Sequence, residues 1–104
     1  MLSHNVFFTL KDASEERCQK LVDACHHFLA PHDGIVFYAA GTLTADLTRE
    51  VNDTAFHVAL NVVFIDRAAH DAYQVSPKHL GFIASNKDDW SQVRVFDSDV
   101  AGAV

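Results

Sequence analysis

The sequence lacks the features that mark a membrane protein or a nucleic-acid-binding protein. No apolar run approaches the roughly 20 residues that a membrane-spanning helix needs. Only 8 Lys and Arg residues stand against 14 Asp and Glu, and the formal net charge is −6. Because the basic residues are scattered singly, no basic stripe can neutralise phosphates or bind an anionic membrane surface. We therefore expect no nucleic acid and no membrane among its partners.

Cysteine is also scarce, and its two occurrences do not suit a disulfide bond. Cys18 and Cys25 lie on one face of a predicted helix, where two turns separate their Cα atoms by about 10 Å, which is too far for a bridge. Both are expected to be small core residues in a reducing compartment. The opening residues 1–5 lack the cationic region of a signal peptide. These features predict a cytoplasmic protein.

The hydrophobic pattern predicts one α+β domain over 1–104, with its core at about 3–98. The segments that alternate, or that are continuously apolar, predict strands at 4–11, 34–43, 56–65 and 92–98. Apolar residues at helical spacing predict a helix that follows a possible capping box at 12–15 and ends at Ala30. Asp66 can cap a second helix through about Val75, and Ser76-Pro77 begins a short third one. This order is the ferredoxin-like β-α-β-β-α-β arrangement with an antiparallel sheet.

The strand predicted at 56–65 is apolar on both faces, so both faces must be covered. Its alternation turns one set of residues toward the helices: Phe56, Val58, Leu60, Val62 and Phe64. The opposite face of the sheet carries Phe7, Ala59, Val63 and Ile65, and no segment of the chain is left to cover it. A second copy is the simplest cover, which predicts an isologous homodimer through the open sheet face, a dimeric α/β barrel. The alternative is a monomer with an exposed apolar patch, which soluble monomers generally avoid.

Seven histidines in a chain of this length raise the question of a metal site. The adjacent residues His26 and His27 point to different sides of their helix, and no H-E-x-x-H or C-x-x-C pattern is present. Two or three ligands from distant segments could still converge, for instance His4, His57 and His79. Ordinary surface and core histidines explain the composition better, so we predict no metal and no cofactor.

The segment 73–82 carries the most chemical information. If Ser76 caps a helix, His79 falls in its first turn, where the helix dipole and burial against Phe82 both disfavour the imidazolium form. A neutral imidazole suits a general base, and the hydroxyl of Tyr73 could donate to a developing oxyanion. Tyr73 is expected on the inward face of the preceding helix with Ala69 and Ala72. The alternative is a buried His and Tyr that satisfy each other across a helix break.

Four segments resemble the stress-responsive A/B-barrel (Dabb) family over residues 4–97. They are the opening 3–8 (SHNVFF), 64–66 (FID), the Tyr73-x-x-x-Pro77-x-His79 signature, and 95–97 (VFD). The resemblance implies the ferredoxin-like fold and the dimeric barrel that the pattern of hydrophobic residues also predicts.

The resemblance further implies roles for individual residues. The family includes a plant polyketide cyclase that closes a linear polyketone by intramolecular aldol condensation. By this resemblance His79 is the base, Tyr73 assists it, Asp97 hydrogen-bonds the histidine, and His4 lines the pocket. The rest of an apolar pocket wall would come from Val6, Phe8, Phe82 and Trp90. The sequence departs from the cyclase at position 58, where valine replaces a pocket histidine, and His57 is expected instead at the dimer face.

Three hypotheses about function follow. The first is a cyclase- or lyase-like enzyme that uses His79 as a base next to the carbonyl of a small apolar or phenolic ligand. The second is a non-enzymatic, stress-related or ligand-binding homodimer, which needs no reactive residue. The third, oxidation like that of antibiotic monooxygenases, rests on shared architecture alone. A cavity that opens onto His79 favours the first hypothesis, and a filled core at that place excludes it.

Overall fold

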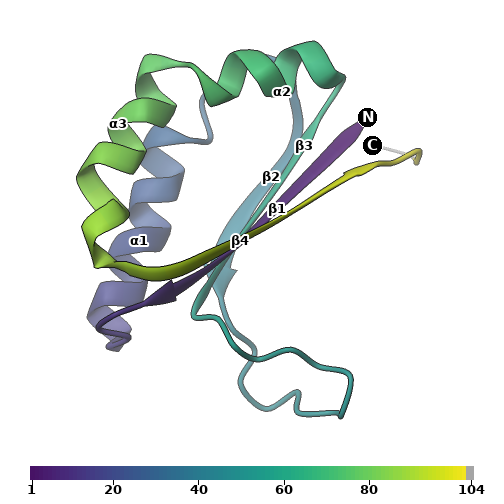
Figure 1. Cartoon of the computed structure of the whole chain (residues 1–104). Helices are drawn as coiled ribbons and strands as arrows, with labels where there is room; N and C mark the ends of the chain where they lie inside the picture. The colour runs from purple at the N-terminus through teal and green to yellow at the C-terminus, as the bar shows by residue number, and fades with distance from the viewer. Residues whose placement is uncertain (103–104) are drawn as a thin grey trace.

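The computed structural model describes residues 1–102 and has the predicted ferredoxin-like α+β fold (Figure 1). Residues 103–104, which belong to the predicted domain 1–104, lie outside the described part. In chain order the elements are β1 (Leu2–Leu10), α1 (Glu15–Phe28), β2 (Ile35–Thr42), β3 (Val58–Phe64), α2 (Arg67–Gln74), α3 (Pro77–Asn86), the short 3₁₀ helix η1 (Lys87–Asp89) and β4 (Trp90–Asp99). Among residues 1–102, no helix has both the length and the apolar character needed to cross a bilayer.

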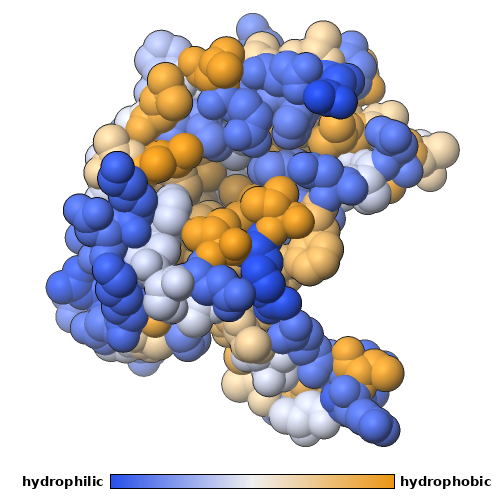
Figure 2. Space-filling model, in the orientation of Figure 1, coloured by the Kyte–Doolittle hydropathy of each residue, from blue (hydrophilic) through white to orange (hydrophobic). Residues whose placement is uncertain are grey.

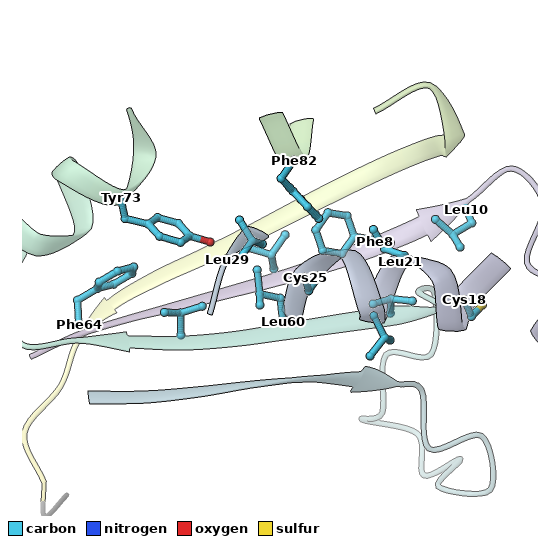
Figure 3. Packing of buried hydrophobic residues seen from close by; sticks show 14 of the residues in the cluster. Phe8, Leu10, Cys18, Leu21, Cys25, Leu29, Leu60, Phe64, Tyr73 and Phe82 are labelled. Carbon is cyan, nitrogen blue, oxygen red and sulfur yellow. The ribbon is translucent and has the colours of Figure 1, made fainter. Parts of the chain in front are cut away.

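The strands form one antiparallel sheet in the order β2-β3-β1-β4, and the helices cover one of its faces (Figure 1). Alternate residues of β1 and β3 are buried beneath the helices, from Leu2 to Leu10 and from Val58 to Phe64. Figure 3 shows Phe8, Leu29 and Phe82 packed between helices and sheet. The predicted period of two is therefore confirmed for both central strands.

The helices begin at short polar side chains. Ser14 caps α1 by accepting the N–H of Arg17, while Asp12 accepts the N–H of Ser14 itself. The predicted capping box at 12–15 is therefore wrong: residue 17, where the box needs Glu or Gln, is an arginine. Asp66 caps α2 and accepts the N–H of Ala69 at 2.8 Å, as predicted.

The inward face of α2 differs from the prediction. Tyr73 is buried and Ala69 is half-buried, but Ala72 is exposed and His70 takes a half-buried place. Residues three and four apart share one side of a helix, so Ala69, His70 and Tyr73 form one stripe and Ala72 lies outside it.

The open face of the sheet carries an aromatic cluster, defined by Phe7, Phe56 and Phe96. The ring of Phe7 contacts the other two edge-on, with centroid distances of 4.9 Å to Phe56 and 5.7 Å to Phe96. Phe56 thus lies opposite to its predicted face, because it precedes the first residue of β3 and the strand alternation does not yet apply to it. His57 closes the end of the pairing between β1 and β3: its Nδ1 accepts the N–H of Leu10 at 3.0 Å.

A turn at Gly34 joins α1 to β2. Gly34 has a φ of +85°, and a Cβ built on it would clash with the Cβ of Ala69. The carbonyl oxygen of Gly34 also accepts the N–H of Ile65 at 2.8 Å. The close approach of α2 to the start of β2 therefore requires glycine at this position.

Gly34→Ala is expected to lower the free energy of unfolding by more than about 1 kcal/mol, because it adds both left-handed strain and a clash with Ala69. Gly81→Ala is the matched control. The nearest atom to its added Cβ is a Phe28 ring carbon at 3.6 Å. That change is expected to be neutral or stabilising by up to about 1 kcal/mol in a helix. Urea unfolding of both variants measures the difference, and equal stability would contradict the role of Gly34.

Candidate functional site

A cavity of about 180 Å³ lies between the sheet and the helices. In Figure 2 the surface between the helices and β4 is hollowed, and hydrophobic side chains gather at its rim. Its polar lining consists of His4, Tyr73, Gln74, His79 and Trp90, and its apolar lining of Val6, Phe8, Leu29, Leu60, Phe82, Ile83, Val93 and Val95. The structure thus brings together all the residues that the sequence places in the pocket. Asp97 is not part of the lining.

His79 lies in the first turn of α3, where the sequence places it. Ser76 caps this helix and accepts the backbone N–H of His79 at 3.1 Å, and Pro77 is the first helical residue. The side chain is buried, and its Nδ1 has no hydrogen-bond partner among residues 1–102. Burial lowers the pKa of His79, and the nearby histidines His4, His32 and His70 act in the same direction. The imidazole is therefore neutral at neutral pH and can accept a proton.

Tyr73 and Trp90 supply buried donors to the same cavity. The hydroxyl of Tyr73 and the Nε1 of Trp90 are buried without a partner in the described part of the chain. The rings of Tyr73 and His79 lie 4.8 Å apart, centroid to centroid, but no hydrogen bond joins them. Tyr73 and His79 therefore do not satisfy each other. Burial raises the pKa of Tyr73, so its phenol keeps its proton and can donate it.

Asp97 contacts His4 and not His79. The register of β1 and β4 pairs His4 with Asp97, and the carboxylate Oδ1 lies 2.5 Å from the Nδ1 of His4. The expected hydrogen bond between Asp97 and His79 is absent from residues 1–102, because the carboxylate meets the nearer ring on the neighbouring strand. The Nε2 of His4 lies 3.5 Å from the amide nitrogen of Gln74 at the cavity wall.

Comparison with known protein families identifies the family of this chain. The sequence model of the Dabb family, the Stress responsive A/B Barrel Domain, matches residues 2–100. The chain belongs to the Dabb family. No curated protein matches this Dabb domain in sequence.

Solved structures share the fold of this Dabb domain. A Dabb family protein from Mesorhizobium loti is 20% identical, with 97% of each chain covered and a TM-score of 0.79. A dimeric ferredoxin-like protein of unknown function from Thermobifida fusca is 15% identical, with 95% of this chain and 90% of that chain covered and a TM-score of 0.78. A hydroxynitrile lyase from Passiflora edulis is 20% identical, with 99% and 95% covered and a TM-score of 0.71. At such identities these similarities show the fold alone.

Sequence reasoning missed His32, which positions the start of α3 in this Dabb domain. Its Nδ1 lies 2.9 Å from the carbonyl oxygen of Leu29, and its Nε2 lies 2.7 Å from the hydroxyl of Ser76. Because Nδ1 donates to the carbonyl, Nε2 of the neutral ring accepts from Ser76. The His32 ring also packs edge-on against Tyr73, with centroids 4.9 Å apart. No periodicity marks His32, because it lies in the loop between α1 and β2.

His70 is the other residue that the sequence did not indicate. Its ring lies 5.3 Å from the ring of His4, centroid to centroid, on the side of the cavity near Asp97. By contrast, the combination of His4, His57 and His79 does not converge. His57 hydrogen-bonds the backbone at Leu10, at the opposite end of β1 from His4.

The stability of this Dabb domain is expected to fall as the pH drops below about 6.5, the ordinary pKa of histidine. The folded state holds the pKa of His79 below that value, so the unfolded state takes up more protons in this range. One such proton contributes a slope of up to about 1.4 kcal/mol per pH unit. His79→Gln is expected to flatten the profile of unfolding free energy between pH 7 and 5. His27→Gln, at an exposed histidine of α1, serves as the control, and equal slopes in both variants would contradict the assignment.

Proposed function

We propose that this Dabb domain binds a small apolar carbonyl or phenolic compound and abstracts a proton next to a carbonyl group, as a cyclase- or lyase-like enzyme. One observation carries the proposal. Three buried polar atoms that have no partner in the described part of the chain, on Tyr73, His79 and Trp90, belong to residues that line one largely apolar cavity. Buried polar groups in folded proteins normally have partners, so such a group of unpaired atoms favours a ligand that supplies them.

In the proposed reaction, each of these residues has a separate role. The C–H proton passes to a ring nitrogen of His79, which becomes an imidazolium, and the electron pair moves to the carbonyl oxygen as an enolate. The hydroxyl of Tyr73 stabilises that oxyanion as a donor, and the indole N–H of Trp90 is a second donor in the same wall. The enolate carbon then attacks a second carbonyl or takes a proton back. Because burial lowers the pKa of His79, its imidazolium returns the proton readily.

The size and lining of the cavity restrict the ligand. Its volume of about 180 Å³ is below the range of drug-sized pockets. Aromatic side chains form part of the wall, with the Trp90 ring 5.0 Å from Phe8 and 5.6 Å from Phe82, centroid to centroid. A short aliphatic or single-ring ketone or phenol fits this lining. The hydroxynitrile lyase from Passiflora edulis shows that the fold is compatible with a lyase.

Ligand binding without turnover is the second candidate, and one contact favours it. Asp97 contacts His4, and within residues 1–102 no carboxylate hydrogen-bonds the Nδ1 of His79 to stabilise a newly formed imidazolium. A site that only binds needs the donors of Tyr73 and Trp90 but not a strong base. The two candidate functions differ in whether a bound ketone loses a proton next to its carbonyl group or stays unchanged.

Exchange of carbon-bound protons distinguishes them. Wild-type protein in D₂O is expected to accelerate deuterium incorporation next to the carbonyl of phenylacetone, followed by proton NMR. His79→Gln is expected to lose about 10²–10⁴ of that rate, which is the usual contribution of a general base. Tyr73→Phe is expected to lose about 10²–10³, the effect of one oxyanion donor. Tyr38→Phe, at the other tyrosine of the chain, is the matched control and keeps the wild-type rate.

Other outcomes are equally informative. If phenylacetone binds to wild type and to His79→Gln without exchange, the second candidate replaces the first. If related ketones and phenols also fail to bind to wild type, as read from shifts of the Trp90 indole resonance, both candidates are wrong.

We also propose that the protein is a homodimer joined through the open sheet face. Phe37, Ile65 and Phe96 are more than half exposed there, and Phe7 and Phe56 of the aromatic cluster are only half-buried. Burying such a surface against a second copy removes it from water at about 25 cal/mol per Å² of apolar area. Dimeric ferredoxin-like proteins from Thermobifida fusca and Bacteroides fragilis have the same fold. Because the cavity lies on the helix side, each subunit would hold its own site.

Phe96→Asp is expected to shift the protein from dimer to monomer in sedimentation velocity at micromolar concentration, because it places a charge within the apolar cluster. Leu80→Lys, at an exposed position on α3, is the matched control and leaves the dimer intact. A wild-type protein that sediments as a monomer would exclude the proposed assembly.

The cytoplasmic location stays a prediction, with which the two free, buried cysteines agree.

A further inference from the structure

Three side chains able to bind a metal ion meet beside the cavity. His4 of β1, His70 of α2 and Asp97 of β4 each offer one ligand atom, and these atoms all lie within 4.8 Å of one another. Strand pairing places Asp97 opposite His4, and packing of α2 on the sheet brings the His70 ring against the His4 ring. The three residues lie far apart in the sequence. The sequence alone therefore predicts no metal site at this place. His4 also lines the cavity, so the cluster adjoins the candidate active site.

We infer that His4, His70 and Asp97 form a binding site for one divalent transition-metal ion of the zinc class. Two imidazoles and one carboxylate are ligands that such ions prefer, whereas Mg²⁺ and Ca²⁺ prefer oxygen ligands throughout. Three protein ligands leave a fourth tetrahedral position open for water or for a ligand atom. The site does not depend on the proposed proton abstraction, which uses His79.

The ring of His70 is already oriented for this role. Its Nδ1 lies 2.9 Å from a carboxylate oxygen of Asp71, which accepts from it, and the guanidinium of Arg67 donates to the same oxygen at 2.8 Å. A histidine that binds a metal usually donates its other ring N–H to a carboxylate in this way. The contact leaves Nε2 of His70 free to bind an ion. Asp71 is therefore a positioning residue for the site.

Burial and geometry also suit an ion at this place. The side chain of His4 is 6% exposed and that of His70 14%, whereas Asp97 is 46% exposed, so an ion can enter from the Asp97 side. The Nδ1 of His4 and the Oδ1 of Asp97 lie 2.5 Å apart. Ligand atoms around a tetrahedral ion lie about 3.4 Å apart. These two atoms would therefore separate by less than about 1 Å to bind an ion between them.

Titration of the metal-free full chain with ZnCl₂ by calorimetry tests the inference. One ion per chain is expected. His70→Gln and Asp97→Asn are expected to weaken binding by more than tenfold, and Asp71→Asn by about tenfold, since it removes only the positioning contact. His27→Gln removes an exposed histidine far from the cluster and is expected to keep wild-type affinity. This control is needed because a single exposed histidine can also bind zinc weakly.

A second measurement needs no variant. Zinc is expected to shift the ring resonances of His4 and His70 in the wild-type NMR spectrum and to leave those of His26, His27 and His57 in place. The inference is overturned if wild type binds no zinc, or if His27→Gln loses the binding that His70→Gln and Asp97→Asn keep. Neither readout depends on activity, so failure here is distinct from failure of the proposed function.

Discussion

The arrangement of the candidate site depends on the hydroxyl group of Ser76. It accepts the backbone N–H of His79 and so begins α3, and it contacts the ring of His32 from the loop after α1. The break between α2 and α3 places Tyr73 at the end of one helix and His79 at the start of the next, with their rings 4.8 Å apart. One small polar residue thus joins three segments around the cavity. Pro77 reinforces the break, because it favours the first helical position and cannot continue a preceding helix.

The histidines around this break act on one another. His79 is surrounded by His4, His32 and His70, and any positive charge that they take up lowers its pKa further. His32 and His4 use their ring nitrogens in hydrogen bonds with Ser76 and Asp97, whereas the Nδ1 of His79 has no partner in the described residues. Proximity alone therefore does not make these residues equivalent. The buried Nδ1 of His79 without a partner is the observation behind its proposed role in proton transfer.

Local patterns in the sequence predict the elements and the pocket, because those depend on short spacings. The alternation in β1 and β3 and the Asp66 and Ser76 caps are confirmed, and Phe8 and Phe82 lie in the lining of the cavity. The partner of Asp97 could not be predicted in this way. It depends on the register between the first and last strands, which no local spacing determines.

The other differences between the predicted and the observed structure also arise where local sequence patterns do not apply. His32 lies in a loop and has no periodic neighbours, so only the tertiary structure reveals its contact with Ser76. Phe56 and Ala72 differ from the prediction because the periodic pattern does not extend to them. For Phe56 the strand begins two residues later, and for Ala72 the inward stripe passes through His70.

The hydrogen bond between His4 and Asp97 gives the cavity a chemical preference. When the His4 ring is neutral, the carboxylate draws its single proton to Nδ1, and Nε2 is left with a lone pair beside Gln74 at the cavity wall. That wall then offers an acceptor to a hydroxyl group, while Tyr73 and Trp90 offer donors to a carbonyl oxygen. Under the proposed function, a compound that carries both groups, such as a hydroxyketone or an enolised diketone, would complement all of them at once.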